Sequence, residues 1–384
     1  MIGRQALLAA LAILAVPSCA YLPSAVPSAA YPSAPHLVAL DTEQCRALLN
    51  DDASIDALQQ AAARSIEFLR TRPLDRSVTV FDHPVTTQEL LSTLDTVSHV
   101  AGPTADLCDQ LRLYRIDAPE RLLVTGYYQP ELAASRKRTE RFRYPLYRVP
   151  ADLVDVELRL FCPACAGQIA QGRVDDGQLI PYYSRAEIDA GALAGRGYEM
   201  AWLDDPVEVF FLQIQGSAML HYPDGVHMQI GYAASNGRPY TSLGRVLVEQ
   251  GKLAKDTISL AVVKDYLHSH PDEQAALMAL NERYIFFRAV PDGPIGSLGV
   301  PLTAGRSIAA DARVYPPGAA VLLRMPPRDG SSGAGMSRMT FIQDAGVAIT
   351  GPSRVDVFWG TGSTAEAIAG EMHDPGELYL LLPQ

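Results

Sequence analysis

Apolar side chains in the first hundred residues follow the spacing of amphipathic helices. Within residues 55–69 they recur every three or four positions until Pro73, which predicts a helix with one buried face. Thr86 and Glu89 form a capping-box pattern ahead of further leucines and predict the start of a second helix. Three more helices are predicted later in the chain, at 243–253, 258–268 and 272–281. We expect the first two helices to be scaffold.

The last hundred residues carry short apolar and β-branched runs separated by Gly and Pro. They predict strands at 284–290, 306–310, 319–325, 339–343, 354–359 and 378–382. A helix capped by Ser363 with Glu366, and running to about Met372, is predicted to interrupt them. Strands this short and this closely spaced are typical of a small barrel. One earlier strand, predicted at 121–128, ends in paired tyrosines beside a turn, a position that often carries binding residues.

The middle of the chain adds polar side chains suited to a sugar. Tyrosines concentrate between residues 127 and 240, and residues 207–215 are predicted to form a strand. In that strand the alternation places Gln213 and Gln215 on one face, opposite the apolar positions. Two neighbouring amides can donate to and accept from hydroxyl and N-acetyl groups. An exposed polar sheet face is the alternative interpretation.

Two aspartates stand in strands that otherwise favour burial. Asp356 lies inside an apolar strand, and Asp344 closes the strand before it. A buried carboxylate is unfavourable unless it is hydrogen-bonded or used, and desolvation raises its pKa above the usual ~3.9, toward a proton donor near neutral pH. The alternative is a structural aspartate that accepts backbone N–H bonds. Asp344 fits that alternative better, because the following Ala345-Gly346 predicts a turn that a carboxylate can cap.

Composition and charge exclude some functions. The 384 residues are enough for two domains, and a net charge of −11 argues against a polyanionic partner. The largest basic cluster, Arg136-Lys137-Arg138, is interpreted as a solvated loop. The sequence contains no phosphate-binding glycine loop and no G-x-S-x-G nucleophile motif. We therefore expect no nucleic acid partner and no Ser/His/Asp hydrolase chemistry.

Residues 1–19 are predicted to be an export signal. The segment has a positively charged start, and Ala6–Val16 is an apolar run too short to span a bilayer. The small residue before Cys19 resembles a lipobox, so we expect lipidation of Cys19, with ordinary cleavage near Ala20 as the alternative. Residues 20–37, rich in Ala, Ser and Pro, are predicted to be a tether that reaches roughly 50 Å.

If Cys19 is an anchor, four cysteines remain for an oxidising compartment. Cys45–Cys108 with Cys162–Cys165 is one of three possible pairings. The Cys-Pro-Ala-Cys spacing of the second pair also matches a redox motif, but no thioredoxin-like pattern surrounds it and no second such motif completes a zinc site. We expect a structural pair or two free thiols there, and no metal or other cofactor.

Several motifs in one order resemble a known family. They are TGYYQP (125–130), YPLYR (144–148), PYYSR (181–185), FLQIQGS (211–217), NGRPYTSLG (236–244), AGRSIAAD (304–311) and QDAGVAITGPSRVDVFWG (343–360). Over roughly residues 40–384 the chain resembles the membrane-bound lytic murein transglycosylase A family. The resemblance implies a mainly β fold with helices, in which a double-psi β-barrel domain (38–130 and 284–384) and an inserted β-rich glycan-binding domain (131–283) enclose a groove.

The resemblance also implies site residues. Asp311, Asp344 and Asp356 look like the three aspartates of the family's C-terminal signature; Asp356 matches the one regarded as catalytic, and Asp344 is expected to tune or orient it. The implied substrate-binding residues are Tyr127, Gln213, Gln215, Gly216, Ser217 and Asp311. The chain departs from the family at one point. The family commonly has two glycines after the first aspartate of this stretch, whereas Val347 follows Gly346 here, which puts the backbone conformation near Asp344 in question.

The implied activity is cleavage of the β-1,4 bond between N-acetylmuramic acid and N-acetylglucosamine of peptidoglycan without water, by an exo-acting lyase that leaves a 1,6-anhydromuramoyl end. One carboxyl can suffice because the C6 hydroxyl of the sugar replaces the nucleophile for which glycoside hydrolases need a second carboxyl. Asp356 would protonate the glycosidic oxygen and then accept the proton of that hydroxyl. A water-using muramidase and a noncatalytic peptidoglycan-binding module are the alternatives. We expect the protein at the periplasmic face of the outer membrane or in the periplasm, with peptidoglycan strands and a possible wall-remodelling complex as partners.

Overall fold

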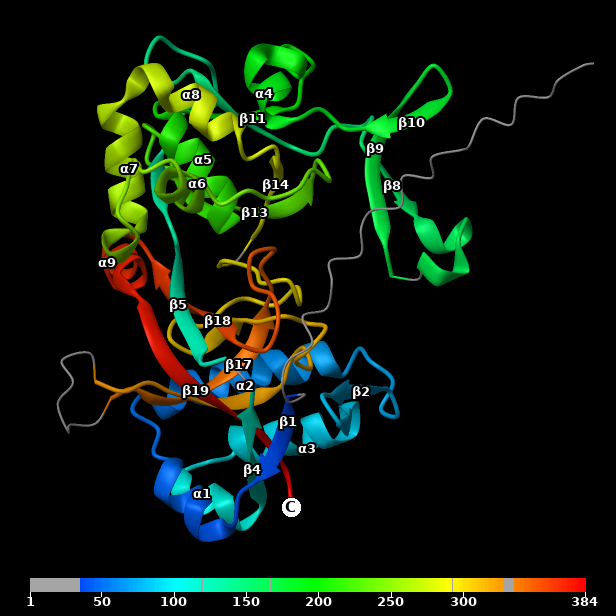
Figure 1. Ribbon diagram of the computed structural model, residues 1–384, viewed down its shortest axis with the longest axis vertical. Coiled ribbons are helices and arrows are strands. Elements are labelled where there is room, and N and C mark those ends of the chain that lie inside the picture. Colours follow the sequence, from blue (N-terminus) through cyan, green and yellow to red (C-terminus); the bar gives the residue numbers. More distant parts are fainter. Residues whose placement is uncertain (1–34, 119, 166, 292, 328–334) are drawn as a thin grey trace, which may run out of the picture.

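The computed structural model describes residues 35–384 except 119, 166, 292 and 328–334. Two bodies are stacked along the long axis of the molecule: the middle of the chain forms the upper body, and the N-terminal helices with the C-terminal strands form the lower body (Figure 1). The predicted signal, Cys19 and most of the tether lie outside the described residues. The tether is shorter than predicted, because strand β1 (His36–Ala39) begins at His36. Among the described residues, none of the helices is both long and apolar enough to cross a membrane.

A closed ring of six strands forms the centre of the lower body. Its members, in spatial order, are β5 (Leu122–Gln129), β18 (Arg354–Thr361), β15 (Ser307–Ala309), β17 (Ser337–Asp344), β16 (Ala320–Arg324) and β19 (His373–Pro383). β19 closes the ring because it pairs with β16 along one stretch and with β5 along another. β4 (Leu111–Asp117) and β1 extend the sheet beyond β19. This mixture of helices with many strands agrees with the predicted class, while the double-psi crossing stays a prediction.

Alternation along the ring strands places apolar side chains inside the ring. In β18, Val355 and Val357 are fully buried, whereas Asp356 between them is half-buried and lies on the other face. The shared core also contains Val124, Ile308, Leu322, Phe341 and Leu380. The ring therefore has an apolar interior and an outer face on which polar groups can be placed.

Two helices pack on each other and on the ring. α2 (Ile55–Leu69) has the predicted bounds and contacts β17, and α3 (Thr87–Ser98) contacts β16 and β19. The predicted capping box is present at the start of α3, where Thr86 Oγ1 accepts from the Glu89 N–H and the Glu89 carboxylate accepts from the Thr86 N–H. A short hairpin of β2 (Ser77–Val80) and β3 (His83–Thr86) leads into α3.

A buried ion pair joins the N-terminal helices to the ring. The Arg306 and Asp51 side chains are 1% and 3% exposed, and the guanidinium donates to both carboxylate oxygens at 2.5 and 2.7 Å. Arg306 also donates to the carbonyls of Ser54 and Met339, and Asp51 accepts from the Met339 N–H. Removing one partner of such a pair would leave the other charge buried and uncompensated.

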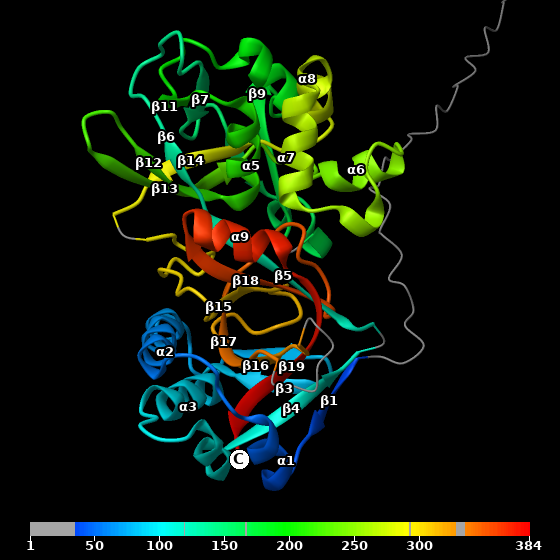
Figure 2. The ribbon, with the colours of Figure 1, turned by 90° about the vertical axis from the view of Figure 1, so that its left-hand side faces the viewer.

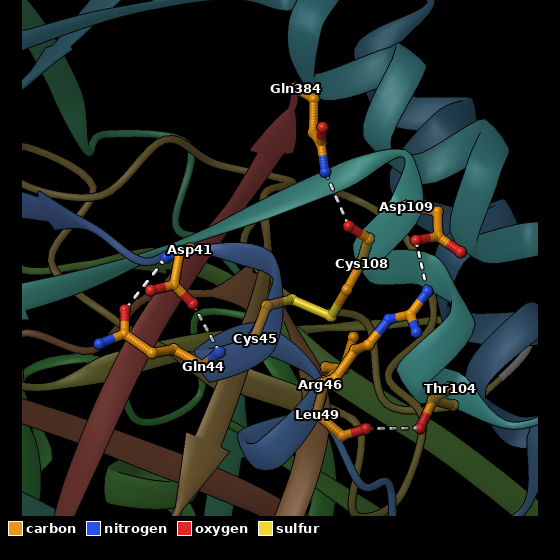
Figure 3. Close-up of a disulfide and its surroundings, with 9 residues drawn as sticks. All are labelled: Asp41, Gln44, Cys45, Arg46, Leu49, Thr104, Cys108, Asp109 and Gln384. Atoms are coloured by element: carbon orange, nitrogen blue, oxygen red, sulfur yellow. Dashed lines mark hydrogen bonds and ion pairs between the residues drawn. A yellow bond between two sulfur atoms is a disulfide. The ribbon is translucent and has the colours of Figure 1, made fainter.

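A disulfide fixes the end of the lower body. Cys45 on α1 (Thr42–Leu48) is bonded to Cys108 in the 3₁₀ turn Thr104–Asp109, and both cysteines are buried (Figure 3). The C-terminal Gln384 donates its side-chain amide to the Cys108 carbonyl at 2.7 Å. The second disulfide joins Cys162 to Cys165. These pairs match one of the three pairings left open by the sequence.

The described residues of the upper body form three small sheets. The largest has the order β14 (Ile285–Ala289), β13 (His227–Ser235), β12 (Ser217–His221) and β6 (Glu131–Ala133). The others are the pair β7 (Tyr144–Tyr147) and β11 (Glu199–Leu203), and the projecting sheet β8 (Val154–Glu157), β9 (Ile169–Asp175) and β10 (Gln178–Pro181). Its helices are α4 (Arg185–Glu187), α5 (Pro206–Gln215), α6 (Leu243–Glu249), α7 (Leu260–Ser269) and α8 (Pro271–Ala279). The last three of these confirm the predicted helices with shorter bounds.

The strand predicted at 207–215 is wrong, because these residues form helix α5. Asp205 caps the helix by accepting from the Val207 N–H, Pro206 occupies the first turn, and Gly216 ends it in a left-handed conformation with φ of 81°. One side of α5 packs in a cluster with α6, α7 and α8, and the other side packs against the largest sheet. A helix buried on two sides is apolar nearly all round, so it lacks the helical periodicity that would have identified it.

Two smaller expectations also fail. The strand predicted at 284–290 was assigned to the barrel, but β14 pairs with β13 in the upper body. The late helix α9 (Ser363–Glu371) begins after Gly362 and has no side-chain cap from Ser363. Its Glu366 instead bonds to groups of β5 and α7, as described below.

Candidate active site

β5 leads from the ring to the upper body, where it contacts α5 and β12, and β18 lies beside β5 below α9 (Figure 2). The two strands run parallel, with Asp356 opposite Thr125 and Phe358 opposite Tyr127. These four side chains share the outer face, because the valines on either side of Asp356 point into the core. β18 is paired along both edges, with β5 and with β15. The backbone that carries Asp356 is therefore held in place from both sides.

Asp356 is a half-buried carboxyl with few partners. Its Oδ1 is shielded from solvent and has no hydrogen-bond partner among the described residues. Burial raises the pKa of Asp356 to about 6, against the lowering effect of the Arg354 guanidinium and with a further raising effect from the Asp344 charge. A carboxyl with this pKa can both give and take a proton near neutral pH.

Asp344 lies beside Asp356 but is firmly hydrogen-bonded. Its Oδ1 accepts from the backbone N–H groups of Ser297 and Ala345 at 2.8 and 2.9 Å, and its Oδ2 accepts from the Tyr127 hydroxyl at 2.8 Å. Burial raises the pKa of Asp344, and these hydrogen bonds to the carboxylate oppose the rise. The pKa of Tyr127 lies well above its usual value, through burial and the Asp344 charge, so Tyr127 remains a donor. Three predicted site residues, Tyr127, Asp344 and Asp356, are thus brought together.

The end of β17 is fixed by contacts to distant segments. The Gln343 amide donates to the Ala61 carbonyl and the Ser65 hydroxyl of α2, and its oxygen accepts from the Ser307 hydroxyl. The loop that carries Ser297 approaches the same point closely: a Cβ on Gly296 would lie 2.4 Å from the Gln343 carbonyl oxygen. A glycine is therefore required there for the Ser297 N–H to reach Asp344.

The departure at Val347 does not disturb this arrangement. Among the described residues, Phe81 and Asp176 are the non-glycine residues with positive φ, so Val347 has an ordinary backbone conformation that needs no glycine. Its side chain is 55% exposed on the loop that connects Asp344 to Asp356. Valine in place of glycine thus adds an apolar side chain to the surface of the site loop, in a backbone conformation that valine can adopt.

Asp311 is buried and hydrogen-bonded to the loop that joins Asp344 to Asp356. It is 6% exposed, and its carboxylate accepts from the Arg313 side chain, the Arg313 N–H and the Gly351 N–H. These bonds lower the pKa of Asp311 although burial opposes them. Asp311 therefore holds this loop in place, and its role in substrate binding stays a prediction.

Gln213 is buried and contacts an arginine of the upper body. It is 5% exposed on α5, and its oxygen accepts from Arg185 Nη2 at 2.7 Å. Arg185 is itself buried, donates to the carbonyls of Asn281 and Arg283, and lies over aromatic rings. Gln213 therefore supports a buried arginine, and its role in glycan binding stays a prediction.

The end of α5 does approach the site. The Gln215 side chain accepts from the N–H of Tyr128, the neighbour of Tyr127, at 3.3 Å. Gly216 caps the helix and Ser217 begins β12, and both are half-buried. Gln215, Gly216 and Ser217 therefore lie where the upper body contacts β5, and their role in binding stays a prediction.

Charged groups also join the two bodies. Lys264 on α7 is 12% exposed and bonds to Glu208 of α5 and to Glu366 of α9 at 3.0 Å each. The same Glu366 oxygen accepts from the Tyr128 hydroxyl at 2.6 Å. This cluster connects the upper body to the strand that carries Tyr127, and it gives Glu366 a role other than the predicted cap.

Sequence reasoning missed three residues near the acid pair. Ser297 contributes only a backbone N–H, which no pattern reveals. Arg354 stands two residues before Asp356, so the predicted strand places both side chains on one face. This spacing could have identified Arg354 as a neighbour of the acid. Tyr240 belongs to the upper body, and the charges of both Arg354 and Asp356 act on its phenol.

Comparisons with known proteins agree with this architecture. The model of the MltA specific insert domain matches residues 123–288, and the model of the 3D domain matches residues 306–382. A crystal structure of membrane-bound lytic murein transglycosylase from Agrobacterium tumefaciens is 31% identical, with a TM-score of 0.79 over 90% of this chain and 97% of that chain. The chain belongs to the membrane-bound lytic murein transglycosylase A (MltA) family.

Other MltA proteins are similar over a smaller share of their sequence. The chain is 30% identical over 263 residues to membrane-bound lytic murein transglycosylase A of Escherichia coli K12, and 28% identical over 271 residues to that of Vibrio cholerae. These alignments cover 67% and 69% of this chain, but only 64% and 66% of the two relatives. A structure of MltA from Neisseria gonorrhoeae is 28% identical, with a TM-score of 0.71 over 92% of this chain and 96% of that chain.

Both matched MltA segments contribute to the acid site. Tyr127 falls within the insert-domain match, and Asp344 and Asp356 fall within the 3D-domain match. The hydrogen bond from Tyr127 to Asp344 joins them. Among the described residues, no group of three or more His, Cys, Asp or Glu side chains could hold a metal ion.

Proposed function

We propose that this MltA-family protein is a lytic transglycosylase that cleaves the β-1,4 bond between N-acetylmuramic acid and N-acetylglucosamine of peptidoglycan. The observation that carries the proposal is the Asp356 carboxyl, whose unpartnered oxygen and pKa of about 6 suit a group that transfers protons. Family membership supports the substrate class, since its relatives are named lytic murein transglycosylases. The glycan would lie across β5 and β18, below the upper body.

Asp356 would serve both proton transfers in turn. Protonated Asp356 gives its proton to the glycosidic oxygen as the bond to C1 of the muramoyl residue breaks. The C6 hydroxyl of the same sugar then attacks C1, and the Asp356 carboxylate takes the hydroxyl proton. The products are a free N-acetylglucosamine hydroxyl and a 1,6-anhydromuramoyl end, and Asp356 is again protonated. No water is consumed.

Asp344 would support this cycle without transferring a proton. Its carboxylate already accepts three hydrogen bonds, each of which favours the charged form. A charge held there raises the pKa of Asp356 and stabilises positive charge that develops at C1. We therefore assign Asp344 to tuning Asp356 and Tyr127 to holding Asp344.

A water-using muramidase is the second candidate reaction. It would need a carboxylate free to activate water beside the general acid. Asp344 does not suit that role, because both of its oxygens are occupied by hydrogen bonds. A noncatalytic binding module is disfavoured for another reason, since binding alone gains nothing from an unpartnered acid.

Digestion of purified sacculi followed by mass analysis tests the proposal. The wild-type protein should release muropeptides lighter by one water than those of a hydrolase. Asp356→Asn should lose at least about 100-fold in rate while keeping affinity for glycan, because the general acid is removed but the shape is kept. Asp344→Asn is the matched variant and should keep measurable turnover with an altered pH profile. Hydrated reducing ends, or half of wild-type activity in Asp356→Asn, would refute the assignment.

We also propose a location in the cell envelope. The relatives are named membrane-bound, and the predicted lipidation of Cys19 would supply the attachment to the periplasmic face of the outer membrane. The tether would then let the acid site reach the peptidoglycan. Metabolic labelling with a fatty-acid analogue, with Cys19→Ser as the control, tests this proposal.

A further inference from the structure

Arg354 is the charged neighbour of the proposed acid on the same strand. Residues two apart on a strand point to the same face and are separated by about 6.6 Å. Arg354 and Asp356 are such a pair, on a strand held at both edges. Arg354 therefore occupies the position next to the proposed acid on the same face of the strand.

The hydrogen bonding of Arg354 is incomplete. A guanidinium has five N–H donors, yet the bond recorded for Arg354 is one long contact of 3.4 Å from Nη1 to the Ala348 carbonyl. Its Nε is shielded from solvent and has no partner within the described part of the chain. A shielded donor without an acceptor is unfavourable unless a ligand supplies one.

Other arginines show how unusual this arrangement is. Arg173, Arg306 and Arg324 also have a shielded, unpartnered Nε, but each has a carboxylate partner: Asp175, Asp51 and Glu377, respectively. Arg354 has no such carboxylate among the described residues. Its charge acts instead on Asp356 and on Tyr240, which reaches the site from the upper body. The free donors of Arg354 are therefore placed between the two bodies, where the glycan is proposed to lie.

The chemistry of peptidoglycan offers the missing acceptor. A muramoyl residue is an N-acetylglucosamine whose O3 carries a lactyl group, and the lactyl carboxyl is either free or joined to the stem peptide. In both forms the lactyl carbonyl carbon carries an oxygen that can accept a hydrogen bond, on the same sugar ring as C1. Chitin has the same β-1,4-linked backbone but lacks the lactyl group. An arginine is well suited to the carboxyl group, because its planar fork can donate two parallel bonds.

We propose that Arg354 binds the lactyl carboxyl oxygen of the muramoyl residue at the cleavage site and thereby distinguishes murein from chitin. This inference rests on the proposed function and extends it to the choice of substrate. It assigns Arg354 a specificity role, separate from the proton transfer by Asp356.

Binding measurements in the Asp356→Asn background test the proposal without turnover. Calorimetric titration would compare a peptide-free glycan fragment that contains muramoyl residues, the same fragment with stem peptides, and chitohexaose. Arg354→Met keeps the length of the side chain but removes every donor. It should weaken binding of both muramoyl fragments by roughly 10- to 100-fold, with the larger loss for the free carboxylate, and leave chitohexaose binding within about twofold. Arg324→Met, which removes an arginine paired with Glu377, is the matched control. It should change neither the affinity for the muramoyl fragments nor the affinity for chitohexaose.

A second readout separates this role from a structural one. Arg354 lowers the pKa of Asp356, so Arg354→Met with Asp356 intact should shift the basic limb of the kcat/KM profile to higher pH, and Arg354→Lys should restore its position. Equal losses for chitohexaose and muramoyl fragments, or unchanged muramoyl binding, would overturn the proposal. If Arg354→Met fails to fold, Arg354→Ala, which also removes every donor, decides by the same ratio of affinities. Failure of the wild-type protein to form anhydro ends would refute the proposed function instead, whatever Arg354 binds.

Discussion

Replacing Asp356 with asparagine should stabilise the folded protein at neutral pH. The folded-state pKa of Asp356 is about 6, against an ordinary value of 3.8, so the folded protein holds this proton more tightly than the unfolded chain does. The stabilisation from that proton is fully present below pH ~4 and is lost as the pH rises through 6. At about 1.4 kcal/mol per pKa unit, the carboxylate destabilises the fold by at most about 3 kcal/mol at pH 7 and above.

The titration depends on the groups that face Asp356 from each neighbouring element. Arg354 lies on its own strand, Asp344 on β17, Tyr127 on β5, and Tyr240 on the upper body. The asparagine side chain of the variant has nearly the same shape as the carboxyl but does not ionise. The difference in unfolding free energy between Asp356→Asn and wild type should therefore be near zero at pH 4 and should rise to its plateau between pH 6 and 7.

Urea unfolding of both proteins at half-unit steps from pH 4 to pH 8 measures this difference. Asp311→Asn is the control, for which the change in stability is expected to have the opposite sign. The pKa of Asp311 is lowered in the folded protein, mainly by its bonds to Arg313 against the effect of burial, so that variant should be less stable than wild type at neutral pH. A pH-independent difference for Asp356→Asn, or a variant less stable than wild type at pH 8, would refute the reasoning.

The remaining predictions concern the scaffold that holds the site. Asp51→Ala should lower the unfolding free energy by about 3–5 kcal/mol, because Arg306 is left buried without its partner, and urea unfolding measures the loss. Gly126→Ala should displace α9 and lower the melting temperature, because the new Cβ would lie 2.8 Å from a backbone atom of that helix. In the double variant Cys45→Ala with Cys108→Ala, the free energy of unfolding should fall by about 2–5 kcal/mol. A reducing agent should no longer lower its melting temperature through this disulfide.

Local patterns were enough to predict several elements. The helix at 55–69 has one buried face, and the capping box at Thr86 satisfies its own N–H groups, so neighbours in the sequence determine both. Strand β18 was recognisable because its valines alternate with polar residues. The same alternation correctly placed Asp356 on a partly buried face with a raised pKa.

Other features depend on partners far away in the sequence. Helix α5 was mistaken for a strand because two separate clusters bury it, which removes its polar face. No local pattern in the sequence indicates that Gln213 accepts a hydrogen bond from Arg185, which lies 28 residues earlier. Tyr127 and Asp344 are 217 residues apart, so their hydrogen bond depends on the sheet order that places β15 and β18 between β17 and β5.

The different roles proposed for the two acid-site aspartates rest on the different numbers of donors that the fold supplies to them. Every hydrogen bond to a carboxylate favours its charged form. Asp344 accepts three such bonds, from the Tyr127 hydroxyl and from the backbone N–H groups of Ser297 and Ala345. Asp356 lies on β18, with β15 between it and the strand of Asp344, and is also half-buried, but its Oδ1 has no donor within the described part of the chain. Burial raises the pKa of both carboxyls, but hydrogen bonds from the protein oppose the rise at Asp344. The proposed cycle therefore assigns the charge of the pair to Asp344 and the proton to Asp356, so that a single carboxyl carries the proton through both halves of the reaction.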